Sequence, residues 1–121
     1  MPPGLRDRLD AWGIQVDPEL LSDMRQRALR EVPDGAHAID LAQMSAPDLR
    51  RWLNETSVVR LNETLDVWWP ADGVAARMDR RSLVDGISDW WCPSQDDLII
   101  AAGADRLLIH HEETAYLWSS H

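Results

Sequence analysis

The spacing of apolar residues in the first half of the chain is helical. Segments 4–13, 17–35 and 45–56 each place apolar side chains three or four positions apart, which gives each segment one apolar face. Asp17 and Pro18 favour the first positions of a helix, and they begin the longest segment. The pattern therefore predicts three helices before residue 57. The first helix is expected to turn three side chains toward the core: Leu5, Leu9 and Trp12.

From residue 57 onward the pattern changes to short apolar runs that favour β-strands. Five runs predict strands, at residues 57–61, 65–69, 97–102, 106–111 and 114–119. Residues 62–64 are expected to join the first two strands as a hairpin loop, and the last three strands to form an antiparallel meander. The intervening segment 77–87 is ambiguous and is compatible with a short helix before Gly86.

These elements predict an α+β fold in one domain over residues 1–121. N-terminal helices are expected to pack on one face of a C-terminal antiparallel β-sheet, the meander. A chain of 121 residues is long enough for one hydrophobic core and too short for two. The helices are predicted before the strands with no linker between them, so a single core is the natural arrangement.

The net charge of −9 narrows the range of partners. Phosphate binding depends on basic side chains, so neither nucleic acid nor an anionic membrane is expected to bind. The charge instead fits a basic protein partner, and a homo-oligomeric adaptor subunit, such as a homodimer, stays open as an alternative. With no apolar signal segment near Met1, a cytoplasmic protein is expected. Cys92 is the single cysteine, which excludes an internal disulfide.

Two tryptophan pairs, Trp68-Trp69 and Trp90-Trp91, are followed by proline and lie close to aspartates. If each pair lies at the end of a strand, its side chains point to opposite faces, and only one can enter a single core. The other meets solvent, a covering helix or a partner. Trp is enriched at interfaces, but in a chain without Phe it is also the main aromatic core residue. Both interpretations stay open.

An exposed tryptophan surrounded by aspartates would suit a basic partner. The binding prediction rests on Trp68, Trp69, Trp90 and Trp91 as anchors, with Asp66, Asp89, Asp96 and Asp97 as charge partners. The expected mechanism is steric blocking of a basic surface, with charge attraction accelerating the encounter.

Residues 109–113, Ile-His-His-Glu-Glu, raise the alternative of a small metal-dependent enzyme. If Ile100 pairs with Ile109, Asp97 comes near Glu112, and a site of two or three ligands becomes conceivable with His110 and His111. Catalytic zinc normally has three protein ligands. Two further alternatives are acid–base work by Asp96-Asp97 and a Cys92 nucleophile beside a histidine. None of these has a recognised motif, so no catalytic residue, metal ligand or cofactor is assigned.

Segment 91–118 resembles the C-terminal sheet of small bacterial immunity proteins, which neutralise polymorphic or contact-dependent toxins. The similar features are the Pro93-Ser94 turn, Asp96-Asp97 before an apolar strand, a second strand that ends in His and Glu, and a last strand near Trp118. The resemblance covers about a quarter of the chain. It implies an acidic, cytoplasmic, non-catalytic protein that binds a toxin domain. It carries over no specific binding residue.

Overall fold

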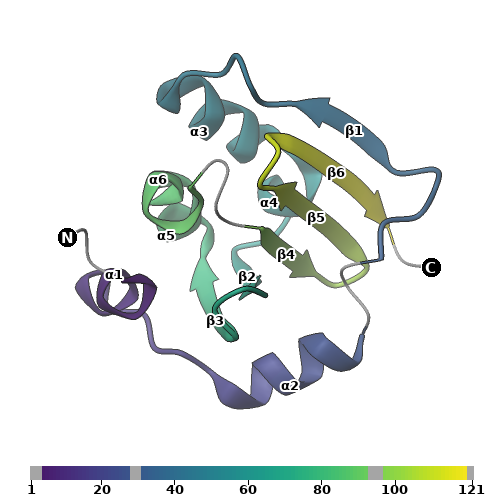
Figure 1. Ribbon diagram of the computed structural model, residues 1–121. Helices are drawn as coiled ribbons and strands as arrows, with labels where there is room; N and C mark the ends of the chain where they lie inside the picture. Colours follow the sequence, from purple (N-terminus) through teal and green to yellow (C-terminus); the bar gives the residue numbers. More distant parts are fainter. Residues whose placement is uncertain (1–3, 28–30, 93–96, 120–121) are drawn as a thin grey trace.

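A computed structural model describes residues 4–27, 31–92 and 97–119. Its helices are α1 (Leu5–Ala11), α2 (Pro18–Gln26), α3 (Ala46–Glu55), α4 (Ser57–Arg60), α5 (Arg80–Asp85) and α6 (Ile87–Trp90). Its strands are β1 (His37–Asp40), β2 (Thr64–Trp69), β3 (Val74–Asp79), β4 (Leu98–Ala102), β5 (Asp105–His110) and β6 (Thr114–Ser119). The predicted α+β class is confirmed, with helices mostly in the N-terminal half and most strands in the C-terminal half (Figure 1).

The strands form a six-stranded antiparallel sheet in the order β1-β6-β5-β4-β2-β3. The predicted meander is β4-β5-β6, at the centre of that order. Two strands were not predicted: β1 comes from the segment between α2 and α3 and pairs with β6, and β3 ends inside the segment that was left ambiguous. Only four residues long, β1 is mostly exposed, so its sequence carries little alternation to reveal it.

Helices cover both faces of the sheet, not one as expected. One face packs against α1, α3, α4, α5 and α6 through apolar residues such as Leu9, Leu53 and Ile87. The other face packs against α2 through Leu20 and Met24. Figure 1 shows α2 crossing the sheet on the side away from the other helices. The second layer solves the problem of two adjacent tryptophans, because Trp69 enters the larger core and Trp68 packs under α2.

Side chains at the helix starts fix where the longer helices begin. The Asp17 carboxylate accepts a hydrogen bond from the backbone N–H of Leu20 (3.0 Å), and Pro18 takes the first helical position. The Ser45 hydroxyl accepts from the backbone N–H of Asp48 (3.3 Å). Both caps satisfy N–H groups that have no partner inside the helix. Both α2 and α3 therefore begin where the sequence predicts.

Residues 57–61 form helix α4 and a C-cap, so the strand prediction there is wrong, and so is the prediction that residues 62–64 form a hairpin loop. Val58 and Val59 are both buried, with exposed fractions of 1% and 0%. Adjacent residues of a strand would point to opposite faces, whereas both reach the same core from a helical turn. Packing against β4 and β5 thus overrides the β-propensity of the valines.

Trp90 closes α6 and Trp91 follows it, so the second tryptophan pair does not lie on a strand. Strand β2 does end at Trp69, immediately before Pro70. Pro93 lies outside the described residues. The two Trp-Trp-containing stretches therefore differ in structure and are not a repeated way of ending strands. Among the described residues no helix has the length and apolar character needed to span a membrane.

Candidate functional site

All four tryptophans of the two pairs are buried, with exposed fractions of 6% for Trp68, 1% for Trp69, 0% for Trp90 and 5% for Trp91. The indole N–H of Trp69 donates to the carbonyl of Trp90 (2.7 Å), and that of Trp90 to the carbonyl of Ser82 (3.0 Å). The rings of Trp69 and Trp90 meet edge to face, with centroids 6.2 Å apart. These side chains build the core, so their burial favours the structural interpretation of the two pairs over the one in which an indole is exposed to a partner.

Trp12 is an exposed tryptophan that sequence reasoning assigned to the core. It caps the C-terminus of α1, and Gly13 then turns the chain away with φ of 73°. The exposed fraction of Trp12 is 38%. Its ring packs on Trp90 with centroids 5.6 Å apart, and its indole N–H donates to the Asp89 carboxylate (2.9 Å). One predicted acid, Asp89, therefore does lie beside an exposed tryptophan, although a different one.

An open groove of about 570 Å³ lies between this tryptophan and strand β3. The α1–α2 connection, residues 13–16, forms one wall, and the end of β3 with the start of α5 forms the other. Asp17, Arg77 and Asp79 are the charged residues that line it. Asp7 and Asp10 of α1 line a neighbouring depression on the other side of the same connection. Among the described lining residues, the groove beside Trp12 therefore holds two acids and one cation, Arg77, and the depression beyond the connection holds Asp7 and Asp10 together with Arg6.

The groove follows an unpaired stretch of the β3 edge. The backbone N–H of Asp17 donates to the carbonyl of Ala75 (2.8 Å), and that of Arg80 to the carbonyl of Glu63 (2.8 Å). In an antiparallel ladder, the backbone N–H and C=O groups of one residue bond to the partner strand, and those of the next residue point away from it. These two bonds place Ala75, Arg77 and Asp79 in the outward set. Within the described part of the chain, no backbone group pairs with the outward N–H or C=O of Arg77.

The acids that line the groove are bonded to backbone donors rather than to cations. Asp17 caps α2, and the Asp79 carboxylate caps α5 by accepting the backbone N–H of Ser82 (2.9 Å). Hydrogen bonds from the side chain and backbone of Ser82 lower the pKa of Asp79 below its ordinary value. Asp79 is exposed and ionised at neutral pH, so its negative charge faces the groove.

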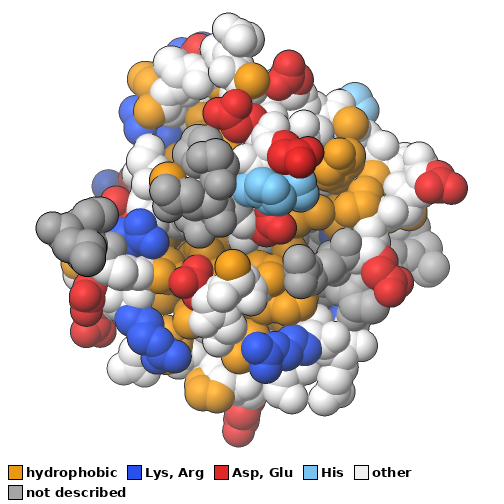
Figure 2. All heavy atoms as spheres, in the orientation of Figure 1, with side chains coloured by type: hydrophobic (Ala, Val, Ile, Leu, Met, Phe, Trp, Pro, Cys, Tyr) orange, Lys and Arg blue, Asp and Glu red, His pale blue; other side chains and the backbone are white. Residues whose placement is uncertain are grey.

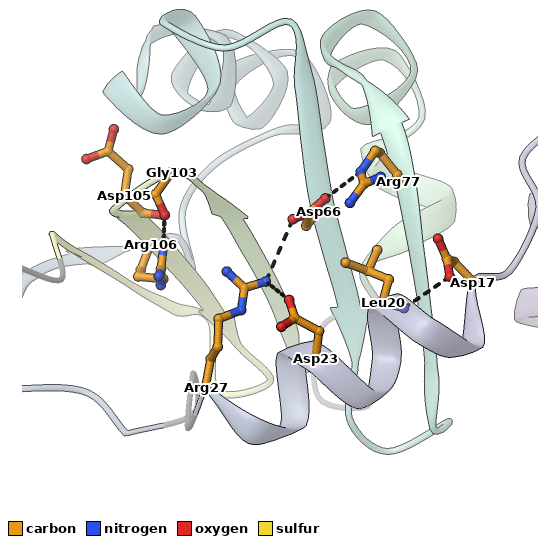
Figure 3. Close-up of polar contacts among 9 residues, drawn as sticks. All are labelled: Asp17, Leu20, Asp23, Arg27, Asp66, Arg77, Gly103, Asp105 and Arg106. Carbon is orange, nitrogen blue, oxygen red and sulfur yellow. Dashed lines mark hydrogen bonds and ion pairs between the residues drawn. The ribbon is translucent and has the colours of Figure 1, made fainter.

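Basic groups gather instead on the sheet face under α2 (Figure 3). Asp66, another predicted charge partner, lies between Arg77 (Nε–Oδ1 2.9 Å) and Arg27 (3.7 Å). The hydrogen bond and charge of Asp66 raise the pKa of Arg77. Nearby, Arg106 is 7% exposed, and burial, with the charge of Arg27, lowers its pKa. Asp66 is thus neutralised within the protein and has little charge left for a partner.

A second polar site lies at the start of β4 and the end of β5. The observed register pairs Leu98 with Ile109 and Ile100 with Leu107, two positions from the expected pairing of Ile100 with Ile109. Asp97 therefore extends the ladder opposite His110 and not near Glu112. The cluster of Asp97, His110 and His111 has ligand atoms that lie within 4.8 Å of one another. Figure 2 shows histidine side chains at the surface beside acidic ones.

Short hydrogen bonds organise this histidine cluster. Oδ1 of Asp97 accepts the backbone N–H of His111 (2.8 Å) and lies 2.8 Å from its ring Nδ1. The two imidazole rings stack with centroids 4.1 Å apart. Burial raises the pKa of Asp97, but the hydrogen bonds from His111 and the nearby histidine charges outweigh it, so the pKa is below its ordinary value. Asp96, the other predicted acid here, lies outside the described residues.

Cys92 lies beside a separate, largely apolar cavity of about 240 Å³. Leu41, Met44 and Leu49 form its apolar wall, and Ser45 and Glu113 contribute polar atoms. The described lining contains no histidine. The predicted histidine partner for Cys92 is therefore not found among the described lining residues.

Comparison of the chain with known protein families, with curated proteins and with solved structures gives no match. A function for the chain is therefore inferred from the geometry of the groove and of the histidine cluster.

Proposed function

We propose that the protein is a non-catalytic binding protein that uses the groove between Trp12 and the β3 edge to hold an extended, basic segment of another protein. The observation that carries the proposal is the exposed Trp12 hydrogen-bonded to Asp89, next to an unpaired strand edge lined by Asp17 and Asp79. This is the inhibitor class that the resemblance to immunity proteins implies. Such a protein masks a basic surface of its target.

Three kinds of interaction support a basic, extended ligand. The outward backbone groups of Arg77 suit the addition of a strand, in which main-chain hydrogen bonds supply affinity. The exposed face of Trp12 suits an arginine side chain, which is attracted by the ring. The carboxylates of Asp17 and Asp79 suit its charge and would raise the association rate. One short peptide segment along the groove would use all three at once.

Charge favours a basic partner over a second copy of this chain. Two copies that paired through their β3 edges would bring two acidic grooves together, and each chain carries a net charge of −9. Like charges placed opposite each other across a strand pair are destabilising. A concentration-dependent mass in analytical ultracentrifugation, lost on substitution of groove residues, would overturn this choice and indicate a homodimer.

The proposal is tested by titrating the protein with a synthetic peptide of alternating arginine and threonine. Calorimetry measures the binding affinity, and nuclear magnetic resonance measures the backbone amide signal of Arg77. Binding is expected to weaken with salt and to shift that signal, because the peptide pairs with the strand edge. A peptide with proline in place of threonine lacks alternate N–H donors and should bind more weakly. Binding that leaves the Arg77 amide unchanged would overturn the docking mode.

Substitutions that keep the helix caps can separate the effect of charge on binding from an effect on folding. The triple variant Asp17→Asn/Asp79→Asn/Asp89→Asn removes three charges, while asparagine retains an oxygen that accepts the same hydrogen bonds. At about 0.5 kcal/mol for each exposed charge contact, peptide binding should weaken about 10-fold. The matched control, Glu31→Gln/Asp34→Asn/Glu55→Gln, removes three exposed acids elsewhere. Equal weakening in both variants would refute a specific groove and leave only attraction by net charge.

A further inference from the structure

We propose that Asp97, His110 and His111 form a binding site for a divalent transition metal ion of the zinc type. The three residues come from two chain segments that the β4–β5 pairing brings together. One carboxylate oxygen and two imidazole nitrogens are a donor set that suits Zn²⁺ and the chemically similar Co²⁺. The site does not depend on the groove and lies on other elements.

The present distances require only small side-chain movements. Zinc binds nitrogen and oxygen at about 2.0–2.2 Å, so ligand atoms around one ion lie about 3–3.5 Å apart. His111 Nδ1 and Asp97 Oδ1 are 2.8 Å apart in a hydrogen bond whose proton a metal ion bound to Nδ1 would displace, and one ligand atom from each of the three residues lies within 4.8 Å of the others. Both imidazoles are partly exposed, with side-chain exposed fractions of 28% and 42%. Rotation of these rings can close the remaining gap without moving the sheet.

Backbone hydrogen bonds orient the ligand groups in advance. The N–H of His111 holds the Asp97 carboxylate, and the N–H of Glu112 points at Nδ1 of His110 (3.2 Å). Nδ1 of His110 is therefore the unprotonated nitrogen of the ring, and a metal ion would bind it in place of the hydrogen bond from Glu112. The carboxylate of Glu112 lies 3.9 Å from the same nitrogen and adds negative charge beside the site, although it is not one of the three clustered ligand groups. Such supporting contacts are typical of protein metal sites.

The turn that carries the histidines has an unusual backbone conformation. Glu113 has φ of 65°, although it is not glycine, and its carbonyl accepts the N–H of Leu41 (2.8 Å). Its own N–H donates to the carbonyl of His110 (3.0 Å), which closes the turn. Residues held in this region are costly and persist where the surroundings fix them. Here the strained turn is what sets His110 and His111 side by side over Asp97.

The test is titration of metal-free protein with Co²⁺, read from the visible absorption bands that low-coordinate cobalt gives, followed by displacement with Zn²⁺. One equivalent is expected. His110→Ala and Asp97→Asn should each weaken binding at least about 10-fold, and both keep the backbone contacts of Asp97 with His111. His37→Ala is the matched control, because His37 is an exposed histidine on β1, and it should bind as the unaltered protein does.

Two outcomes would overturn the metal site. One is the absence of cobalt bands with the ion in excess over folded protein. The other is equal binding by the unaltered protein and His110→Ala, which would place the ion elsewhere. The peptide titration of the groove is run in parallel with a chelator present. The groove contains none of the three ligands, so a variant that loses metal binding should still bind the peptide. The failure of one proposal can therefore be distinguished from the failure of the other.

Discussion

The groove and the histidine cluster both contain ionised aspartates, but the aspartates have different partners. In the groove, Asp17 and Asp79 accept hydrogen bonds from backbone N–H groups at helix starts, and their nearest cations, Arg77 and Arg81, act on them through charge without a direct hydrogen bond. In the cluster, Asp97 bonds to a histidine that can itself become a cation or hold one. The contrast indicates that acids acting as helix caps can attract a basic partner, whereas the cluster suits a small positive ion.

The two regions also differ in what supports them. Trp12 rests on Trp90, which in turn packs against Trp69, so the groove is built on the tryptophan core. The cluster is held by the pairing of β4 with β5 and by the turn after His110. Changes to the tryptophan core should therefore disturb the groove first.

The largest effect is expected from Trp90→Ala. The side chain is fully buried, and its loss removes a large aromatic surface together with the hydrogen bond to Ser82. Truncation of such a core residue costs about 3–5 kcal/mol of unfolding free energy, which denaturant titration measures. Leu61→Ala is the control, because Leu61 is 64% exposed and should change stability by less than about 0.5 kcal/mol. A similar cost in both variants would contradict this account of the core.

A milder change, Gly86→Ala, should disturb the groove and spare the cluster. A Cβ at this position would lie 2.7 Å from Nε1 of Trp90 and 2.9 Å from the carbonyl of Ser82. Overpacking of this kind costs about 1–3 kcal/mol, and it should shift the indole signal of Trp12 through Trp90.

Gly35→Ala is the matched control for that substitution, because nothing lies within 4 Å of a Cβ placed there. Nuclear magnetic resonance reads both regions in one spectrum. Equal shifts of the His110 and Trp12 signals in Gly86→Ala would show that the two regions are coupled. That result would contradict the separate support of the groove by the tryptophan core and of the cluster by the β4–β5 pairing.

Substitutions at the caps separate charge from hydrogen bonding and have smaller effects. Asp17→Ala should cost about 1 kcal/mol, because it removes the acceptor for the N–H of Leu20. Asp17→Asn keeps an acceptor and should cost at most about 0.5 kcal/mol, the usual size of the helix-dipole effect at an exposed site. Thermal unfolding of the two variants measures the difference. If Asp17→Asn lowers the unfolding free energy as much as Asp17→Ala does, the main role of the Asp17 charge is to stabilise α2 rather than to attract a partner.

The sequence predicted the α+β class, the first three helix starts and the meander because each has a strong local signal. Asp17 and Ser45 are capping residues in the right place, and β4, β5 and β6 are apolar runs separated by turn residues. Helix α4 and strand β1 lack such signals. The valines of α4 favour strands in isolation, and only packing against β4 and β5 makes the segment helical.

The site was harder to predict because burial is decided by the whole fold. Nothing local indicates that α2 covers Trp68, or that Trp90 lies on a helix under Trp12. Asp89 does lie beside an exposed tryptophan, but that tryptophan is Trp12, 77 residues away in the chain, and not a member of the predicted pairs. The hairpin prediction already placed Asp97 near the histidines. The residue opposite Asp97 was not predicted correctly, because the predicted strand register differs from the observed one by two residues.

The smallest effect concerns the pH dependence of the Asp97–His111 pair. Because the folded protein lowers the pKa of Asp97 below its ordinary value of 3.8, its ionised form is favoured by folding. The resulting stability is complete above the unfolded pKa and is lost as the pH falls through the lower folded pKa.

Asp97→Asn keeps an acceptor for the N–H of His111 but does not ionise. Its difference in unfolding free energy from the unaltered protein should shrink as the pH falls below about pH 4. Asp34→Asn, an exposed acid, serves as the control and should show no such change. A difference for Asp97→Asn that grows as the pH falls would mean that folding favours the protonated acid, and the pair would then be poorly suited to hold a metal ion.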